Sequence, residues 1–443
     1  MTLPAPPKTF KVKSFGCQMN VYDGERMGEL LAAQGMAGVG EREDADLVVL
    51  NTCHIRERAV DRVYSDIGRL RRDDGSVPLI AVAGCIAQAE GAEIMRRAPS
   101  VRMVVGPQAY HRLPAMVAEA AAGRASTDTE MPADAKFAAL PPRSTGGRKS
   151  APSAFLTVQE GCDKFCTYCV VPYTRGAEIS RPFDDLMAEA QALSAAGARE
   201  ITLLGQNVNA WRVVGPTGRK VGLADLIRAL SVLPDLARIR YTTSHPADMD
   251  DDLIAAHGEV AKLMPFLHLL VQSGSNAILK AMNRSHTVDS YLRLLERVRA
   301  VRPDIALSGD FIVGFPGESE ADFAATLALV KAVGYAQAYS FKYSPRPGTP
   351  AATMPDQVAP EVMDERLQRL QAALNRDQVL FNQASVGRRC TVMVERRGKL
   401  PGQWLGKSPW LQSVHFFGEA AIGDLVEVEL IEAGANSLAG RLI

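Results

Sequence analysis

The composition of this chain is that of a globular protein. It has 443 residues, of which 47% are hydrophobic, and its formal net charge at pH 7 is zero. These values exclude a disordered chain and a polycation, so any contact with nucleic acid must come from a local basic patch. At roughly 150 residues per domain, the length suggests about three domains.

The sequence carries no signal for export or membrane insertion. No apolar run approaches the roughly 20 residues of a membrane span. The start, Met1-Thr-Leu-Pro-Ala-Pro-Pro-Lys8, lacks the basic-then-apolar order of a signal peptide. We therefore expect a cytoplasmic protein with no membrane partner. In a reducing compartment its seven cysteines are metal ligands or core residues more often than disulfides.

The pattern of residues 8–125 predicts repeated strand–helix units. Such repeats of short apolar strands and amphipathic helices are typical of a small parallel sheet with helices on its faces. The expected strands are Lys11–Phe15, Ala45–Leu50, Leu79–Ala83 and Val101–Val105. The expected helices are Asp23–Gln34, Glu57–Arg72, Gln88–Arg97 and Leu113–Ala122.

Three of these strands end in a cysteine, namely Cys17, Cys53 and Cys85. The carboxyl ends of parallel strands share one edge of a sheet, where ligands bind, so the three thiols should converge there. A single buried cysteine is normally a small hydrophobic residue. A protease-like pair of Cys53 and His54 is a weaker option, because adjacent residues on an extended segment point to opposite faces. Our interpretation is a three-thiolate iron–sulfur site with one open iron.

Residues 126–147 lack a sustained apolar period and read as a linker. Residues 148–380 then form the largest domain, in which six strand–helix units predict an incomplete TIM-like barrel with its chemistry at the carboxyl ends of the strands. The expected strands are Ala154–Val158, Glu200–Leu204, Arg238–Thr243, Phe266–Val271, Ile305–Val313 and Ala336–Phe341. Helices are expected at Pro182–Ala196, Ser290–Ala300 and Glu320–Val333.

A compact cysteine loop follows the first strand of this domain. Cys162, Cys166 and Cys169 have the spacing C-x₃-C-x₂-C, and Tyr168 precedes the last of them. A structural zinc site takes four closed ligands, and an ordinary [4Fe–4S] centre takes four cysteines. Three thiolates leave one iron with an open position for a substrate or cosubstrate. The plainer alternatives are a cysteine-lined turn or a zinc site.

The last segment, 381–443, alternates polar and apolar residues between glycines, which predicts a small β-barrel. Within it, 388–407 holds six basic residues and one acid, beside Trp404 and Trp410. Cations beside aromatic stacking platforms are typical of an RNA-binding surface. The alternative is an ordinary solvated basic face. We interpret Cys390, alone in this segment, as a packing or surface residue.

Together these motifs resemble one family over essentially the whole chain. The order of Gly16-Cys-Gln-Met-Asn20, Asn51-Thr-Cys53, Gly84-Cys85, the C-x₃-C-x₂-C loop and a terminal β-barrel is similar to the radical S-adenosylmethionine (SAM) methylthiotransferases. The resemblance implies an N-terminal methylthiotransferase domain, a partial (β/α)₆ radical SAM barrel and a terminal RNA-binding TRAM module. It also implies two [4Fe–4S] clusters, an auxiliary one on Cys17, Cys53 and Cys85 and a SAM-binding one on Cys162, Cys166 and Cys169.

The family has three branches that differ in substrate. One modifies isopentenyladenosine in tRNA, a second modifies threonylcarbamoyladenosine in tRNA, and a third modifies an aspartate of a ribosomal protein. The pieces Asp163-Lys-Phe165 and Val170-Val-Pro172 are similar to the first branch, as are Gly205-Gln-Asn-Val-Asn-Ala210 and Thr243-Ser-His-Pro246. Leu270 departs from the usual proline, which a strand tolerates because proline removes a ladder donor.

The resemblance implies methylthiolation of C2 of N6-isopentenyladenosine at tRNA position 37, with two SAM molecules per turnover. One SAM would methylate a sulfur held on the auxiliary cluster, and the other would be cleaved reductively to a 5′-deoxyadenosyl radical. Such a low-potential cluster needs a reductant such as flavodoxin or ferredoxin as partner. We expect a monomer. The rival from another class is an electron-transfer protein that relays electrons between two clusters without SAM chemistry.

Several residues at strand ends are candidates for contacts with SAM. These are Gly205, Gln206 and Asn207 after the second strand, Gln272 after the fourth, Gly314 in the turn after the fifth, and the backbone of Tyr168. Each has a plainer role as a turn, solvated or packing residue. Arg175 and Arg181 could contact phosphate or the SAM carboxylate, or pair with Asp and Glu.

Overall fold

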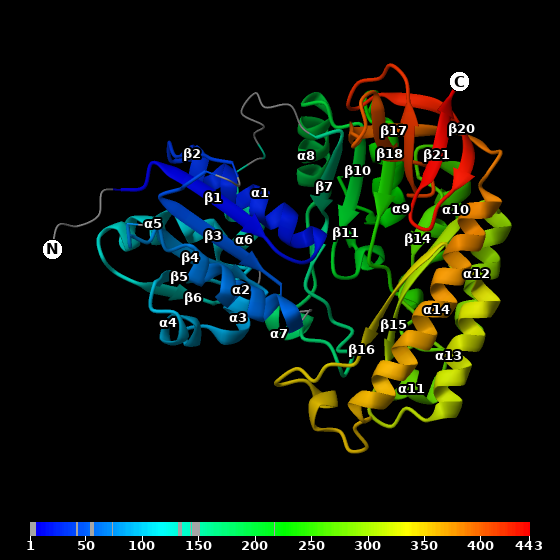
Figure 1. The fold of residues 1–443 in the computed structure, drawn as a ribbon, viewed down its shortest axis with the longest axis horizontal. Coiled ribbons are helices and arrows are strands. Elements are labelled where there is room, and N and C mark those ends of the chain that lie inside the picture. Colours follow the sequence, from blue (N-terminus) through cyan, green and yellow to red (C-terminus); the bar gives the residue numbers. More distant parts are fainter. Residues whose placement is uncertain are drawn as a thin grey trace. The chain divides into compact units, whose positions relative to one another are not determined.

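The computed structural model describes residues 6–40, 43–53, 57–72, 74–131, 135–141, 143, 151–216 and 218–443, with the backbone alone at 57–61 and 135. The chain divides into two compact units (Figure 1). The first comprises Met1–Ser144, Glu160–Asp163 and Val170–Ile179, and the second comprises Thr145–Gln159, Lys164–Cys169 and Ser180–Ile443. Among the described residues, no helix is both long and apolar enough to cross a membrane.

The first unit is built on a six-stranded parallel sheet in the order β2-β1-β3-β4-β5-β6. Its central strands are apolar runs buried on both faces, and all six residues of β3 are buried, as expected for a covered parallel sheet. The strands are β1 (Thr9–Ser14), β2 (Ala37–Gly38), β3 (Leu47–Thr52), β4 (Leu79–Gly84), β5 (Val101–Val105) and β6 (Ser126–Asp128).

Helices cover both faces of this sheet because successive side chains of each strand point to opposite sides. Leu47 and Val49 of β3 pack with α1 (Gln18–Ala33) and α5 (Leu113–Ala121). Val48 and Leu50 pack on the other face with α2 (Glu57–Arg69) and with α3 (Cys85–Glu90) and α4 (Glu93–Arg97). The 3₁₀ turn η1 (Tyr110–Arg112) and the short helices α6 (Ala135–Ala139) and α7 (Val171–Thr174) complete the unit.

The four strands and four helices expected in 8–125 are present, with ends shifted by a few residues and one helix divided. The helix expected at Gln88–Arg97 is two helices, α3 and α4, because the chain turns at Gly91 with φ +53°. In the segment expected to be a linker, β6 and α6 are regular structure. Residues 132–134, 142 and 144–147 of that segment lie outside the described residues.

Six parallel strands in chain order form the partial barrel of the second unit. Two three-stranded sheets, β13-β10-β7 and β14-β15-β16, are joined by single bridges between Ile239 and Leu263 and between Ser244 and Leu269. The strands are β7 (Ser153–Thr157), β10 (Glu200–Leu204), β13 (Arg238–Tyr241), β14 (Phe266–His268), β15 (Ala306–Val313) and β16 (Gln337–Lys342). The predicted α/β class with a partial (β/α)₆ barrel is confirmed.

Helices separate these strands, and several begin at side-chain caps. Ser319 caps α13 by accepting from the Asp322 N–H, and Thr287 caps α12 in the same way through Ser290. The helices are α8 (Phe183–Ala195), α9 (Leu223–Ser231), α10 (Asp251–Glu259), α11 (Asn276–Ala281), α12 (Val288–Val301), α13 (Glu320–Val333) and α14 (Pro360–Ala384). The 3₁₀ turns are η2 (Val208–Ala210), η3 (Pro246–Asp248) and η4 (Pro350–Thr353).

Shorter strands flank the cysteine loop and the second strand of the barrel. The strands β8 (Gln159–Glu160) and β9 (Ile179–Ser180) precede and follow the loop. The antiparallel pair β11 (Arg212–Val214) and β12 (Lys220–Gly222) lies between β10 and α9 in the sequence.

The chain ends in a closed five-stranded barrel, as predicted, with strand order β17-β18-β19-β21-β20. These strands are β17 (Arg389–Arg397), β18 (Gln403–Lys407), β19 (Ser413–Phe417), β20 (Leu425–Ala433) and β21 (Leu438–Leu442), drawn in orange and red in Figure 1. The side chain of Arg240 on β13 donates to the carbonyls of Ser408 and Pro409, so the small barrel is anchored to the larger one by buried hydrogen bonds.

Candidate cluster and cosubstrate sites

The structure places Cys17, Cys53 and Cys85 at one edge of the parallel sheet. Each follows the carboxyl end of a strand, and β1, β3 and β4 are neighbours whose last residues pair, Ser14 with Asn51 and Thr52 with Gly84. The chain leaves β1 toward β2 on one side and reaches β3 on the other. The gap between β1 and β3 is therefore the topological switch point, where open α/β sheets bind ligands.

The backbone approaches closely at this edge. Gly16 has φ +99°, and a Cβ added there would lie 2.3 Å from the Cβ of Cys53 and 3.0 Å from its Sγ. Only glycine satisfies both conditions. The Cys17 thiol donates to Asn20 Oδ1 at 3.4 Å, and Asn20 in turn donates to the Phe15 carbonyl. The strand-end loops therefore hold the thiols in defined positions.

The acidities of these thiols differ because their surroundings differ. A hydrogen bond with Cys53 and the charge of Arg175 lower the pKa of Cys17 to about 6, against the effect of burial. Burial raises the pKa of the Cys85 thiol, although the charge and hydrogen bond of Arg175 act in the opposite direction. A thiolate is the form that binds metal, so an acidic Cys17 beside a cation suits a ligand. His54 lies outside the described residues, and the Cys53–His54 alternative with it.

A buried network of ion pairs lies close to these cysteines in the first unit. The Arg175 guanidinium donates to Asp23 Oδ2 at 2.7 Å and to Glu160 Oε1 at 3.2 Å. The Lys136 ammonium donates to Glu160 Oε1 at 2.6 Å and to Asp23 Oδ1 at 3.3 Å. Gln108 donates to the second oxygen of Glu160. Arg175 therefore pairs with Asp and Glu carboxylates, which was one of its two predicted roles.

The cysteine loop begins in the first unit. There the Cys162 N–H donates to the Gly176 carbonyl at 3.3 Å. The preceding Gly161 has φ +74°, and an added Cβ would lie 1.9 Å from the Ala177 carbonyl oxygen. The turn before Cys162 therefore requires glycine, because a side chain would collide with backbone.

The remainder of the loop belongs to the second unit and is anchored at several points. The Cys169 N–H donates to the Cys166 carbonyl, and Arg284 donates to the Cys166 Sγ at 3.6 Å. Asn283 donates to the carbonyls of Lys164 and Phe165. Hydrogen bonds from these side chains hold a loop in which Phe165 adopts the left-handed φ of +45° and is 53% exposed.

The predicted contact residues after β10 lie in a polar cluster. The N–H groups of Gln206 and Asn207 both donate to Gln159 Oε1, at 2.9 and 3.0 Å. The Asn207 side-chain amide donates to Asp248, which also pairs with Lys164 at 2.8 Å. The Asn207 Oδ1 is buried, and no hydrogen-bond partner for it occurs among the described residues.

Gln272 and Gly314 follow β14 and β15, and both have left-handed backbone, at φ +76° and +71°. Gln272 is 6% exposed, and its N–H donates to the Asp310 carbonyl. The Gly314 N–H donates to Glu318 Oε2 at 2.7 Å. An added Cβ at Gly314 would also collide with the side chain of Met363.

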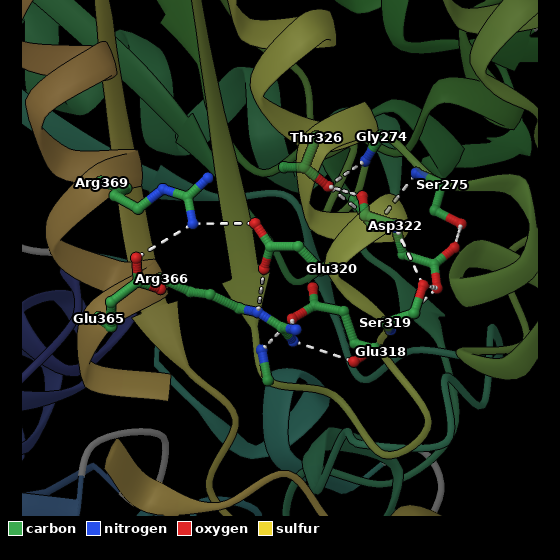
Figure 2. Close-up of polar contacts among 12 residues, drawn as sticks. Gly274, Ser275, Glu318, Ser319, Glu320, Asp322, Thr326, Glu365, Arg366 and Arg369 are labelled. Atoms are coloured by element: carbon green, nitrogen blue, oxygen red, sulfur yellow. Dashed lines mark hydrogen bonds and ion pairs between the residues drawn. The ribbon is translucent and has the colours of Figure 1, made fainter. Parts of the chain in front are cut away.

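Figure 2 shows the polar cluster that fixes this turn. Arg366 of α14 donates to the carboxylate and to the backbone carbonyl of Glu318, at 2.8 and 2.9 Å. Desolvation raises the pKa of the Glu318 carboxyl, against the opposing effect of Arg366. Asp322 of α13 accepts from both Ser275 and Ser319, which joins the loops after β14 and β15 (Figure 2).

The side chains of two other predicted residues have contacts within the protein. Arg181 pairs with Glu189 at 2.8 Å and donates to the Thr157 carbonyl, so its charge is compensated within the protein. The Tyr168 ring packs beside Met282 and Phe315, and burial raises the pKa of its hydroxyl. Cys390 is buried in the core of the small barrel, and burial raises its pKa to about 11, so its predicted packing role is confirmed.

Sequence reasoning missed several anchors, among them Gln159, Asp248, Asn283 and Arg284. They come from four different segments, and no short motif links them to the cysteine loop. Gln159 and Asp248 follow strand ends, which is the one sequence signal that could have identified them.

The prediction of an aromatic stacking platform is wrong for Trp404. This residue is 5% exposed and packs in the barrel core, with its indole N–H on the Gly418 carbonyl, because its ring is large enough to fill a core position. Trp410 is partly exposed, donates to the Asp304 carbonyl and packs against Phe266 and Ala306. The basic residues remain at the surface, and Arg397 lies over the Trp404 ring at 4.5 Å.

The chemistry of the predicted ligands suits an iron–sulfur cluster. Each predicted set consists of three cysteines, and in such a cluster each thiolate binds a different iron. Among the described residues, no group of three His, Cys, Asp or Glu side chains is gathered closely enough to hold a single metal ion.

Comparison with known families and structures agrees with this architecture. Residues 9–106 match the uncharacterized protein family UPF0004, residues 156–330 the radical SAM superfamily, and residues 383–443 the TRAM domain. A radical SAM methyltransferase, TsrM from Kitasatospora setae, solved with cobalamin and a [4Fe–4S] cluster bound, has a similar fold. Its TM-score is 0.57 at 13% identity, covering 90% of this chain and 80% of that one.

Two curated relatives are similar over nearly their whole length. The tRNA-2-methylthio-N(6)-dimethylallyladenosine synthase of Novosphingobium aromaticivorans is 77% identical over 99% of this chain and 98% of its own. The synthase of the same name from Erythrobacter litoralis is 74% identical, with the same coverage. The chain belongs to the family of tRNA-2-methylthio-N(6)-dimethylallyladenosine synthases.

Proposed function

We propose that this protein transfers a methylthio group to C2 of N6-isopentenyladenosine (N6-dimethylallyladenosine) at position 37 of tRNA. The observation that carries the proposal is the 77% identity with a synthase of that name over 99% of the chain. The order of six cysteines in two sets of three agrees with it. Substrates of the other two branches, threonylcarbamoyladenosine and a ribosomal-protein aspartate, are the alternatives.

The substrate carbon explains why such a chain needs a cofactor. C2 of adenine bears only hydrogen and has no leaving group, so an acid–base pair of side chains cannot replace that hydrogen with sulfur. The difficult step therefore belongs to the cofactor, and the protein supplies binding, orientation and exclusion of water. Reductive cleavage of SAM on a low-potential [4Fe–4S] cluster provides the carbon-radical chemistry when both are bound.

We assign the SAM-binding cluster to Cys162, Cys166 and Cys169. The Arg284 N–H on Cys166 Sγ is the kind of hydrogen bond to sulfur that adjusts a cluster potential. The hydrogen bonds of Asn283 to the loop carbonyls hold the loop in its left-handed conformation. These contacts support a preformed site, because an exposed loop without them would have many conformations.

The candidate SAM contacts remain Tyr168, Gly205, Gln206, Asn207, Gln272 and Gly314. The buried Oδ1 of Asn207 supports this assignment, because a buried acceptor without a partner is costly unless a ligand satisfies it. An ammonium group such as that of SAM is a suitable donor. Gly205 and Gly314 lie at the ends of the second and fifth strands, where barrel enzymes bind their ligands.

We assign a second, auxiliary cluster to Cys17, Cys53 and Cys85. Their position at the switch point of the sheet and the lowered pKa of Cys17 support this role. When bound there, such a cluster would supply the sulfur that is transferred. The total would be two [4Fe–4S] clusters and two SAM molecules per turnover.

The expected partners are the anticodon loop of tRNA and a reductant such as flavodoxin or ferredoxin. The TRAM match and the basic residues of the small barrel support the RNA contact. They are Arg388, Arg389, Arg396, Arg397, Lys399 and Lys407. We further propose that the protein acts as a cytoplasmic monomer, and that its domains are 8–125, 148–380 and 381–443 with a linker at 126–147.

Mass spectrometry of tRNA nucleosides from a deletion strain tests the substrate. Loss of 2-methylthio-N6-isopentenyladenosine, with accumulation of the unmethylthiolated nucleoside and its recovery on complementation, is the expected result. Unchanged levels of that nucleoside would refute the assignment. Loss of the threonylcarbamoyl derivative, or of a methylthio group on a ribosomal protein, would identify the other branches.

A second measurement separates catalysis from electron relay. The reconstituted protein with dithionite and SAM should release 5′-deoxyadenosine. Intact clusters without this product would favour the electron-transfer alternative.

A further inference from the structure

Arg175 connects two features of the first unit that are far apart in sequence. It lies six residues beyond the last cysteine of the loop, yet its guanidinium is 3% exposed and faces the cysteines at the sheet edge. Its bonds to Asp23 and Glu160 leave the planar group with little freedom to move. A buried cation in a fixed position beside thiols acts on them through a low-dielectric medium, where charge effects are strong.

Two contacts direct the guanidinium toward the cysteine site. Its Nη2 atom donates to Asn20 Oδ1 at 3.2 Å, the same oxygen that accepts from the Cys17 thiol. It also hydrogen-bonds the Cys85 side chain. Arg175 is therefore linked to one cysteine directly and to a second through Asn20.

The guanidinium is held by two carboxylates, and a second cation shares these carboxylates with it. Asp23 and Glu160 are buried carboxylates, and Lys136 bridges both of them, so the two acids and two bases balance. Lys136 contacts these carboxylates and the rings of Tyr110 and Phe137. The two cations thus share their acidic partners but have different further neighbours, with thiols on Arg175 and aromatic rings on Lys136.

We propose that Arg175 is a positioning residue of the auxiliary site, whose guanidinium offsets thiolate charge at Cys85 and Cys17 and so raises the reduction potential of the cluster held there. This inference rests on the proposed auxiliary cluster. Net charge and hydrogen bonds to sulfur are the main means by which a protein sets a cluster potential. A fixed cation favours the reduced state, because reduction adds a negative charge beside it.

The consequence for function concerns the reduced state of the auxiliary cluster. A cluster that stores sulfur need not reach the low potential that SAM cleavage requires, and a higher potential protects its reduced state from accidental oxidation. Arg284 makes a guanidinium contact with Cys166 of the loop, so the effect of Arg175 is a property of the auxiliary cluster and not by itself a difference between the two clusters.

The test is a redox titration of the auxiliary cluster alone, followed by electron paramagnetic resonance. The full chain with Cys162, Cys166 and Cys169 changed to alanine is reconstituted with iron and sulfide, with and without Arg175→Gln. The variant should show about a tenfold lower ratio of reduced to oxidised cluster at a fixed potential, a negative shift of about 59 mV for a one-electron couple. Arg175→Lys, which keeps the charge, should recover most of the shift.

Lys136→Gln is the matched control, because it removes the same charge from the same network without a thiol contact. Its shift should be clearly smaller than that of Arg175→Gln. Equal shifts for the two variants, or no shift for Arg175→Gln in a protein that retains its iron, would overturn the inference. If the triple-cysteine background binds no iron, the auxiliary cluster itself is refuted, which is a separate result. If Arg175→Gln fails to fold, Arg175→Met, which also removes the charge but keeps an unbranched side chain, replaces it, and a shift no larger than that of Lys136→Gln refutes the direct contact.

Discussion

The two cysteine sites of this chain are built in opposite ways. Cys162, Cys166 and Cys169 lie within eight consecutive residues of one loop, so their spacing alone brings them together. Cys17, Cys53 and Cys85 come from three separate strand ends, and only the parallel pairing of β1, β3 and β4 makes them neighbours. One site is a local motif, and the other is a product of topology.

The two sites therefore depend on different parts of the structure. The loop site depends on anchors to a few side chains, such as Arg284 and Asn283. The sheet-edge site depends on the whole hydrophobic core that sets the register of the strands. Local changes should therefore affect the loop site most, and changes of the sheet should affect the edge site most.

The largest expected effect is at the loop. Changing Cys162, Cys166 and Cys169 to alanine should abolish 5′-deoxyadenosine formation and lower bound iron to about half, because in the proposed function these three thiolates hold one of two clusters. Iron analysis and product chromatography measure these outcomes. Cys390→Ala, which removes a buried thiol from the small barrel, is the control and should keep both. Retention of full iron in the triple variant would disprove the ligand assignment.

The corresponding change at the sheet edge should separate the two sites. With Cys17, Cys53 and Cys85 as alanine, bound iron should again fall to about half, since the loop cluster remains. Cleavage of SAM should survive, while formation of the methylthiolated nucleoside should stop. Nucleoside mass spectrometry and 5′-deoxyadenosine assays on the same sample give both values. A variant that still methylthiolates tRNA would remove these residues from the mechanism.

A smaller effect is expected from the turn before the loop. Gly161→Ala should destabilise the fold by about 3 kcal/mol or more, because it combines left-handed strain with a collision against a carbonyl. Gly176→Ala in the same unit has φ +85° with only Met131 Sδ at 3.8 Å, so it should cost about 1 kcal/mol. Chemical unfolding compares the two. Similar losses of unfolding free energy would show that the left-handed backbone, rather than the collision with the Ala177 carbonyl, makes glycine necessary at position 161.

Two arginines of α14 in the second unit differ in whether their ion pairs are buried or exposed. Arg366→Gln leaves Glu318 buried without its ion pair, which should cost about 3 kcal/mol and loosen the Gly314 turn. SAM binding by calorimetry should weaken accordingly. Arg369→Gln, whose partners Glu320 and Glu365 are solvent-exposed, should change stability by less than about 1 kcal/mol. Equal effects from the two arginines would contradict the importance given to the buried pair.

Sequence patterns predicted most of the longer strands and helices because their apolar periods are strong, but not the 25-residue helix α14. They missed β2, with two residues, and β6, with three, because such short strands carry no detectable period. They also missed α6, which contributes the buried Lys136. The prediction for Trp404 was wrong because the sequence alone does not distinguish a core tryptophan from an exposed stacking platform.

The class of chemistry follows from the amino-acid sequence, because a C-x₃-C-x₂-C loop is a local pattern that can be recognised without the fold. The sequence also indicates the order of the three parts of the chain and the phase of the three separate cysteines. Which charged residues surround those cysteines is seen only in the tertiary structure. Asp23, Lys136, Glu160 and Arg175 come from distant segments, and burial, which no spacing reveals, makes them one network.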